Sequence, residues 1–108
     1  MREYRLYIDD IQQAIVKIQS YIAGMSLDDF KTDSKTYDSV VHNLMIIGEA
    51  AVKIPEEIRG KRPDINWSGI IGMRNIIVHG YFMVDADIIW NTITLRLPEL
   101  MAAIEDLT

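Results

Sequence analysis

The chain has 108 residues, of which 49% are hydrophobic and 25% charged, and its net charge is −5. This composition excludes a disordered chain, and the length suits one domain spanning residues 1–108. With no cysteine and two histidines, the chain has no disulfide framework, no thiolate metal site and no histidine cluster, so we do not expect zinc. We find no membrane span of about 18 apolar residues and no signal peptide, so we expect a cytoplasmic protein.

The charges are distributed unevenly along the chain. Residues 53–79 hold five basic and three acidic side chains, whereas residues 80–108 hold one basic and five acidic ones. Because non-specific affinity for nucleic acid comes from neutralising phosphates, the net charge argues against a broad nucleic-acid binder. Any RNA contact is therefore expected near the middle segment. The plain alternative is that these charges form an ordinary solvated surface.

The first third of the chain predicts one long helix followed by a short one. Apolar residues recur every three or four positions over residues 4–22, the period of a buried helical stripe, and Gly24 follows as a stop signal. Ser26 and Asp29 have the spacing of a capping box, so a short helical turn is expected there. The polar residues 31–34 then predict a loop.

Residues 35–54 keep a helical period and predict a second long helix, which Pro55 ends. Gly48 inside this helix costs about 1 kcal/mol relative to alanine, so its presence predicts a neighbouring helix that lies very close. Residues 55–59 predict a short helix that Gly60 closes.

The last third of the chain predicts two more helices. One is expected over residues 67–80, with Asn66 or Ser68 as its N-cap. Its core candidates are Ile70, Ile71, Ile76, Ile77 and Val78. Asp85 predicts the start of the last helix, which Pro98 is expected to kink or split. Because no segment alternates like a strand, the predicted fold is all-α, an up-and-down bundle of four to five helices.

The run from residue 72 to 81 combines a guanidinium, an amide, an imidazole and a phenol. On a helix Asn75 and His79 share a face, whereas Arg74 and His79 lie roughly 140° apart around the axis. A second copy of the helix, related by two-fold symmetry, would bring an Arg-His set from each protomer into one cleft. A homodimer is therefore part of the predicted site.

These residues suit the cleavage of a phosphodiester bond in RNA. The reaction needs a base for the 2′-hydroxyl, an acid for the leaving oxygen and a cation for the charge at phosphorus. His79 suits the proton transfers and Arg74 the charge stabilisation, while the Asn75 amide can orient the imidazole or the phosphate. The scheme requires no metal and no cofactor.

A structural interpretation of the same residues stays open. Arg74 would then form a salt bridge, His79 would be a helix-end histidine, and Tyr81 would pack with its hydroxyl at the surface. His42 has no acid or second histidine at ligand spacing, so it is expected to be structural or to lie at the edge of the site.

Short segments spread along the chain carry a resemblance to a known family. They are residues 43–50, residues 55–59, Asn66-Trp67 and, above all, residues 72–75 together with residues 79–82. Together they resemble the HepT-like family of small helical proteins, within the HEPN superfamily, over nearly the whole chain. The family's Arg-polar-(three to five residues)-His pattern falls on Arg74, Asn75 and His79, and its His-x-Tyr extension ends on Tyr81.

The resemblance implies a metal-independent endoribonuclease toxin that acts on tRNA or mRNA. It implies a homodimer with a composite active site, in which the matched Arg74 and His79 serve catalysis. It also implies an antitoxin partner, a minimal nucleotidyltransferase that transfers AMP from ATP to Tyr81, and a larger hetero-oligomer with that partner is compatible with it. The added phosphates would repel RNA, which would silence the toxin.

Two positions depart from the family pattern. His42 stands where many relatives have arginine, which puts phosphate binding in doubt, and Gly80 stands where an acidic residue is common, which can loosen the helix end before Tyr81. The alternative function is a non-catalytic helical partner or substrate-binding subunit of a nucleotidyltransferase.

Overall fold

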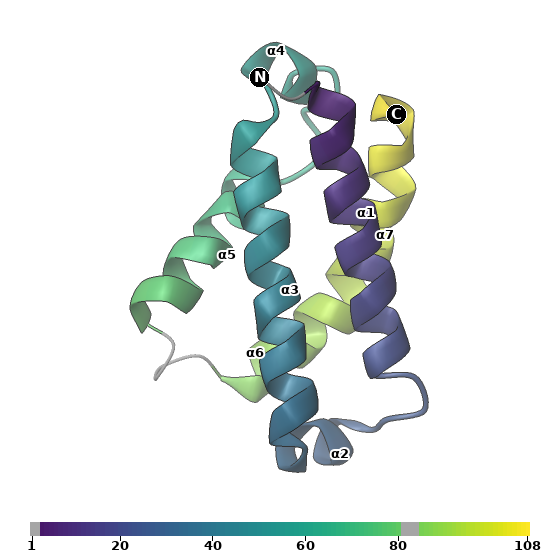
Figure 1. The fold of residues 1–108 in the computed structure, drawn as a ribbon, viewed down its shortest axis with the longest axis vertical. Coiled ribbons are helices and arrows are strands. Elements are labelled where there is room, and N and C mark those ends of the chain that lie inside the picture. Colours follow the sequence, from purple (N-terminus) through teal and green to yellow (C-terminus); the bar gives the residue numbers. More distant parts are fainter. Residues whose placement is uncertain (1–2, 81–84) are drawn as a thin grey trace.

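The computed structural model describes residues 3–80 and 85–108, without the side chains of residues 76 and 78–80. These residues form helices and no strand. The long helical units run alternately down and up (Figure 1), and they are α1 (Tyr4–Tyr21), α3 (Ser34–Lys53), α5 (Trp67–Gly80) and α6 (Ala86–Asn91) with α7 (Leu97–Ile104). The short helices α2 (Leu27–Thr32) and α4 (Glu56–Arg59) lie between them. The predicted all-α, up-and-down bundle is confirmed.

Helix α3 is the central element, because α1 packs along one side of it and α5 along the other (Figure 1). The middle of the apolar stripe of α1 is fully buried, as its period predicts: Ile8, Ile11, Ile15 and Ile18. Burial stabilises the fold by about 1.5–3 kcal/mol for each such side chain. Helix α7 also packs against α1, whereas α5 packs chiefly against α3. In the part of the chain that the structure describes, no helix is long and apolar enough to cross a membrane.

Helix α1 ends and α2 begins at the predicted signals. Gly24 has a φ of +77°, a left-handed conformation that favours glycine. Ser26 Oγ accepts a hydrogen bond from the Asp29 N–H, and the Asp29 carboxylate accepts one from the Ser26 N–H, both at 3.1 Å. The capping box therefore exists as its spacing predicts.

The loop predicted over residues 31–34 is wrong. Only one residue, Asp33, separates α2 from α3, and it caps α3 by accepting hydrogen bonds from the Thr36 N–H at 3.0 Å and from the Thr36 hydroxyl at 2.8 Å. Phe30 is fully buried, and its ring centroid lies 5.3 Å from that of Trp90, which holds α2 in place. The polar residues belong to a sharp corner between two helices. The buried Phe30 ring holds α2 in place and the Asp33 cap begins α3, so no loop separates the two helices.

The last helical unit is split near Pro98, as predicted. Asp85 begins it, since its side chain accepts a hydrogen bond from the Asp87 N–H at 2.8 Å. A π-helical segment, η2 (Thr92–Arg96), joins α6 to α7, and Pro98 lies in the first turn of α7. Because proline has no N–H to donate, the regular ladder cannot run through it. A short 3-10 helix, η3 (Glu105–Leu107), follows α7.

Helix α5 is anchored at its start by two hydrogen-bonded side chains. Of the two predicted N-cap candidates, Asn66 is the one that caps the helix. Its Oδ1 accepts a hydrogen bond from the Gly69 N–H at 3.1 Å. The Trp67 indole N–H donates to the carbonyl oxygens of Arg59 and Arg62, each at 3.1 Å. Of the predicted core residues, Ile77 is buried and Ile70 and Ile71 are half-buried, while the side chains at 76 and 78 lie outside the described part.

Helices α3 and α5 approach one another very closely at Gly48. A Cβ atom at this position would lie 2.5 Å from Arg74 Cβ and 3.3 Å from the Ile70 carbonyl oxygen. Two carbon atoms that are not bonded do not approach to 2.5 Å, so only glycine permits this distance between the helices. The close neighbour predicted from Gly48 is confirmed.

We predict that Gly48→Ala lowers the free energy of unfolding by up to about 2 kcal/mol. The cost of overpacking, about 1–3 kcal/mol, exceeds the gain in helix propensity, about 1 kcal/mol. Gly72→Ala is the matched control, because no described atom beyond its own stretch of α5 lies within 4 Å of a Cβ at Gly72. This variant should gain about 0.5–1 kcal/mol, and urea unfolding measures both. Equal effects of the two substitutions would contradict the close contact.

We predict that the Asp33 cap makes the fold sensitive to acid. Hydrogen bonds from the Thr36 N–H and hydroxyl hold the pKa of Asp33 below its ordinary value of 3.8. The carboxylate therefore stabilises the fold above pH 3.8, and this contribution is lost as the pH falls through the lowered pKa. Asp33→Asn should show a shallower loss of stability between neutral and acidic pH in thermal unfolding. Parallel pH profiles of wild type and variant would rule the cap out as the cause.

Candidate functional site

Arg74 lies in the middle of α5, against Gly48 of α3. Its Nε donates a hydrogen bond to Glu49 Oε1 at 2.5 Å, and its Nη1 donates one to Asn75 Oδ1 at 3.0 Å. The side chains of Arg74 and Glu49 are 37% and 43% exposed. The guanidinium is therefore held in place at the surface of the bundle, where a ligand can reach it.

The terminal nitrogens of this guanidinium, Nη1 and Nη2, are the part suited to a ligand. A guanidinium carries five N–H groups, one on Nε and two on each terminal nitrogen, and Glu49 and Asn75 accept two of them. None of the described side chains accepts a hydrogen bond from Nη2. The two terminal nitrogens can therefore present a pair of parallel N–H groups, the geometry with which arginine binds a phosphate.

The structure brings two of the four predicted site residues together. Arg74 and Asn75 are hydrogen-bonded, so the amide orients the guanidinium. His79 lies in the last turn of α5, but its side chain is outside the described part, and its predicted cooperation with Arg74 stays a prediction. Tyr81 lies outside the described residues. The salt bridge expected from the structural interpretation exists between Arg74 and Glu49. It is compatible with phosphate binding because it uses only Nε of the guanidinium.

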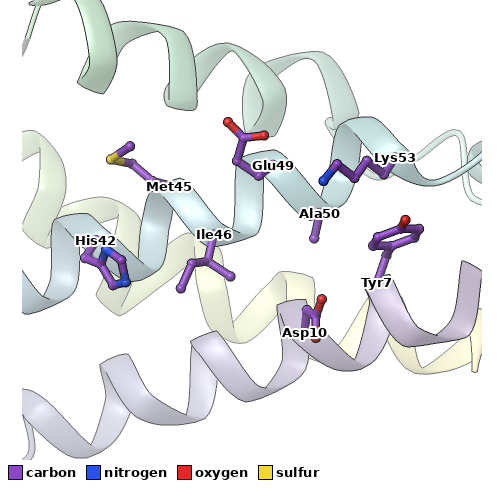
Figure 2. A pocket seen from close by; sticks show the side chains of 8 residues that line it. All are labelled: Tyr7, Asp10, His42, Met45, Ile46, Glu49, Ala50 and Lys53. Atoms are coloured by element: carbon purple, nitrogen blue, oxygen red, sulfur yellow. The ribbon is translucent and has the colours of Figure 1, made fainter. Parts of the chain in front are cut away.

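A shallow groove of about 280 Å³ follows the outward face of α3 beside α1 (Figure 2). It is lined by Tyr7, Asp10, His42, Met45, Ile46, Glu49, Ala50 and Lys53. His42 is exposed and stands two helical turns before Glu49, so it is no core histidine. Within the described residues, no three histidine, aspartate or glutamate side chains gather as a metal site requires.

Glu49 is the residue of the site that sequence reasoning missed. The sequence pattern included it only within residues 43–50 and gave it no role in the chemistry. A signal for it existed, because it follows Gly48, the glycine that predicted a close helix. A polar residue beside such a glycine is a candidate for contact with that helix, and Glu49 makes this contact through Arg74.

Comparison with known proteins places these residues in a family context. The family model described as Ribonuclease HepT-like matches residues 11–107. A probable ribonuclease HepT of Thermococcus cleftensis is 35% identical over 106 residues, which cover 98% of this chain and 96% of that protein. A putative RNase of Caldanaerobacter subterraneus subsp. tengcongensis is 36% identical over 107 residues, with coverage of 99% and 96%. A putative RNase of Methanocaldococcus jannaschii is 30% identical over 106 residues, with coverage of 98% and 88%. No solved structure matches this chain.

We predict that the Arg74–Glu49 ion pair contributes little to the stability of the fold. Both side chains are more than a third exposed, and water screens such pairs, whose coupling is typically about 0.2–1 kcal/mol. A double-mutant cycle with Arg74→Ala, Glu49→Ala and the double variant, followed by urea unfolding, measures the coupling. It should decrease further at high salt. A coupling above about 2 kcal/mol, insensitive to salt, would instead mark a buried structural pair.

Proposed function

Because the chain belongs to the HepT-like ribonuclease family, we propose that it is a metal-independent endoribonuclease whose site is built on Arg74 and His79. The observation that carries the proposal is the guanidinium of Arg74. It is held at Nε by Glu49 and at Nη1 by Asn75, and its side chain is 37% exposed. A cation fixed in this way before substrate arrives is what a developing phosphorane charge requires.

The proposed reaction is an attack of the ribose 2′-hydroxyl on the neighbouring phosphorus. A base removes the proton of the 2′-hydroxyl, the bond from phosphorus to the 5′-oxygen breaks, and an acid protonates that oxygen. The products are a 2′,3′-cyclic phosphate and a 5′-hydroxyl end. His79 supplies the proton transfers, Arg74 stabilises the charge at phosphorus, and Asn75 orients Arg74.

A homodimer completes the site in this proposal. Arg74 and His79 are five residues apart on α5, so a single helix presents them in different directions. Gly72 lies two residues before Arg74, roughly 200° around the helix axis from it, and no described atom beyond its own stretch of helix lies within 4 Å of a Cβ there. A second copy packed on this side of α5 would bring the Arg-His sets of two protomers into one cleft.

The proposed setting is a cytoplasmic toxin-antitoxin pair, in which cellular RNA is the substrate. A minimal nucleotidyltransferase would act as the antitoxin by attaching AMP to Tyr81, two residues after His79, with a hetero-oligomer as the inactive form. The attached phosphates would place negative charge beside the site that has to receive RNA phosphate. Tyr81 is the proposed acceptor because it ends the family's His-x-Tyr pattern in this sequence.

A second candidate function is a non-catalytic helical partner or substrate-binding subunit of a nucleotidyltransferase. The observation that favours it is the net charge of −5, which is unfavourable for holding a long RNA. In that case Arg74 would bind the phosphates of a nucleotide and not those of RNA. Cleavage of RNA by the purified protein separates the two functions.

We predict that the purified protein cuts a mixed pool of tRNA and mRNA with EDTA present throughout. His79→Ala and Arg74→Ala should lower the rate by about 10²–10⁴-fold, the usual contribution of such groups. Arg96→Ala is the matched control for a lost arginine, since Arg96 is exposed on the last helical unit. The readout is the amount of product with 2′,3′-cyclic phosphate ends. Intact RNA with the wild type, or equal cutting by wild type and His79→Ala, would leave the partner function as the better account.

A further inference from the structure

We propose that Glu49 is a positioning residue, which holds the Arg74 guanidinium with its terminal nitrogens directed at the scissile phosphate. This inference rests on the proposed ribonuclease function. Glu49 touches no substrate atom in this scheme, and it acts through Arg74, whose Nε donates to its carboxylate at 2.5 Å.

Glu49 is the group that fixes Arg74 relative to the rest of the bundle. Asn75 also binds the guanidinium, but it is the next residue of the same helix and moves with Arg74. Glu49 comes from α3, the central helix, 25 residues earlier in the chain. Figure 2 shows its side chain leaving α3 on the side opposite to Tyr7 and Asp10 of α1. The Glu49 carboxylate therefore fixes the Arg74 guanidinium relative to α3, whereas Asn75 fixes it only relative to α5.

The backbone contact next to Glu49 sets the geometry of this ion pair. Gly48 brings α3 so close to α5 that its Cβ position would overlap Arg74 Cβ. Glu49 follows Gly48 on α3, and Arg74 is the residue of α5 that Gly48 contacts. The packing of the two helices therefore determines the distance between the Glu49 and Arg74 side chains. An arginine side chain has many rotamers, and a fixed carboxylate at Nε selects among them before substrate binds.

It matters for the chemistry that Glu49 binds Nε of Arg74 and not a terminal nitrogen. Glu49 uses Nε and Asn75 uses one of the four terminal N–H groups, so the other three remain for a phosphate. The same carboxylate repels RNA, because its charge has the sign of phosphate. A positioning role and a plain surface charge therefore lead to opposite expectations. Removing a surface charge would improve cleavage through tighter binding, whereas removing a positioning residue lowers kcat even though RNA binds as well or better.

The test compares Glu49→Ala and Glu49→Gln with wild type and Arg74→Ala on one RNA that the wild type cuts, with kcat and KM measured separately. Glu49→Ala should lower kcat by about 10- to 100-fold, the loss expected from a misplaced group, with KM unchanged or lower. Glu49→Gln should recover most of kcat, because its amide oxygen accepts the Nε–H bond. Glu99→Ala is the matched control, since it removes an equal charge from the exposed pair with Arg96 and should change neither constant.

Each other outcome overturns the inference in a recognisable way. If Arg74→Ala abolishes cleavage while Glu49→Ala retains the wild-type kcat, the ribonuclease function stands and only the positioning role is lost. If Glu49→Gln is as slow as Glu49→Ala, the charge matters and the orientation does not. If the wild type fails to cut any RNA, the proposed function fails and this inference fails with it. Circular dichroism and thermal unfolding of each variant confirm that the helices are intact.

Discussion

The contact between α3 and α5 at Gly48 is the constraint on which the rest of the site depends. At this point no side chain separates the two helices, and Arg74 Cβ occupies the space that any other residue at 48 would need. Gly48 weakens the helix by about 1 kcal/mol relative to alanine. The close approach that it permits brings the residues on either side of the crossing within hydrogen-bonding distance of the other helix.

The site combines a rigid frame with a group that the fold does not need. The isoleucines of α1 and the core face of α3 bury the apolar surface, and they stabilise the bundle without the candidate site. Arg74 and Glu49 lie half-exposed outside this core. Because water screens their attraction, the pair contributes little to folding. The pair therefore lies at a surface of a chain that belongs to the HepT-like ribonuclease family, where the proposed ribonuclease function gives it a role.

Local signals in the sequence predicted the elements of the fold well. The period of the isoleucines, the capping box at Ser26 and the split at Pro98 act within a few residues, so their physical meaning does not depend on the rest of the chain. The polar corner around Asp33 was predicted wrongly for the complementary reason. Its helical conformation depends on Phe30, whose ring packs against Trp90, and no local pattern records a contact over such a distance.

The sequence by itself determined the long helices, the buried stripe of α1, and the presence of Arg74, Asn75, His79 and Tyr81 in one short segment. It also determined that a helix had to lie against Gly48. Only the tertiary structure decided which helix this is and which carboxylate meets Arg74. Glu49 and Arg74 are 25 residues apart, and their distance follows from how two helices cross. That crossing is set by the shapes of all the packed side chains together, so no single segment of the sequence contains it.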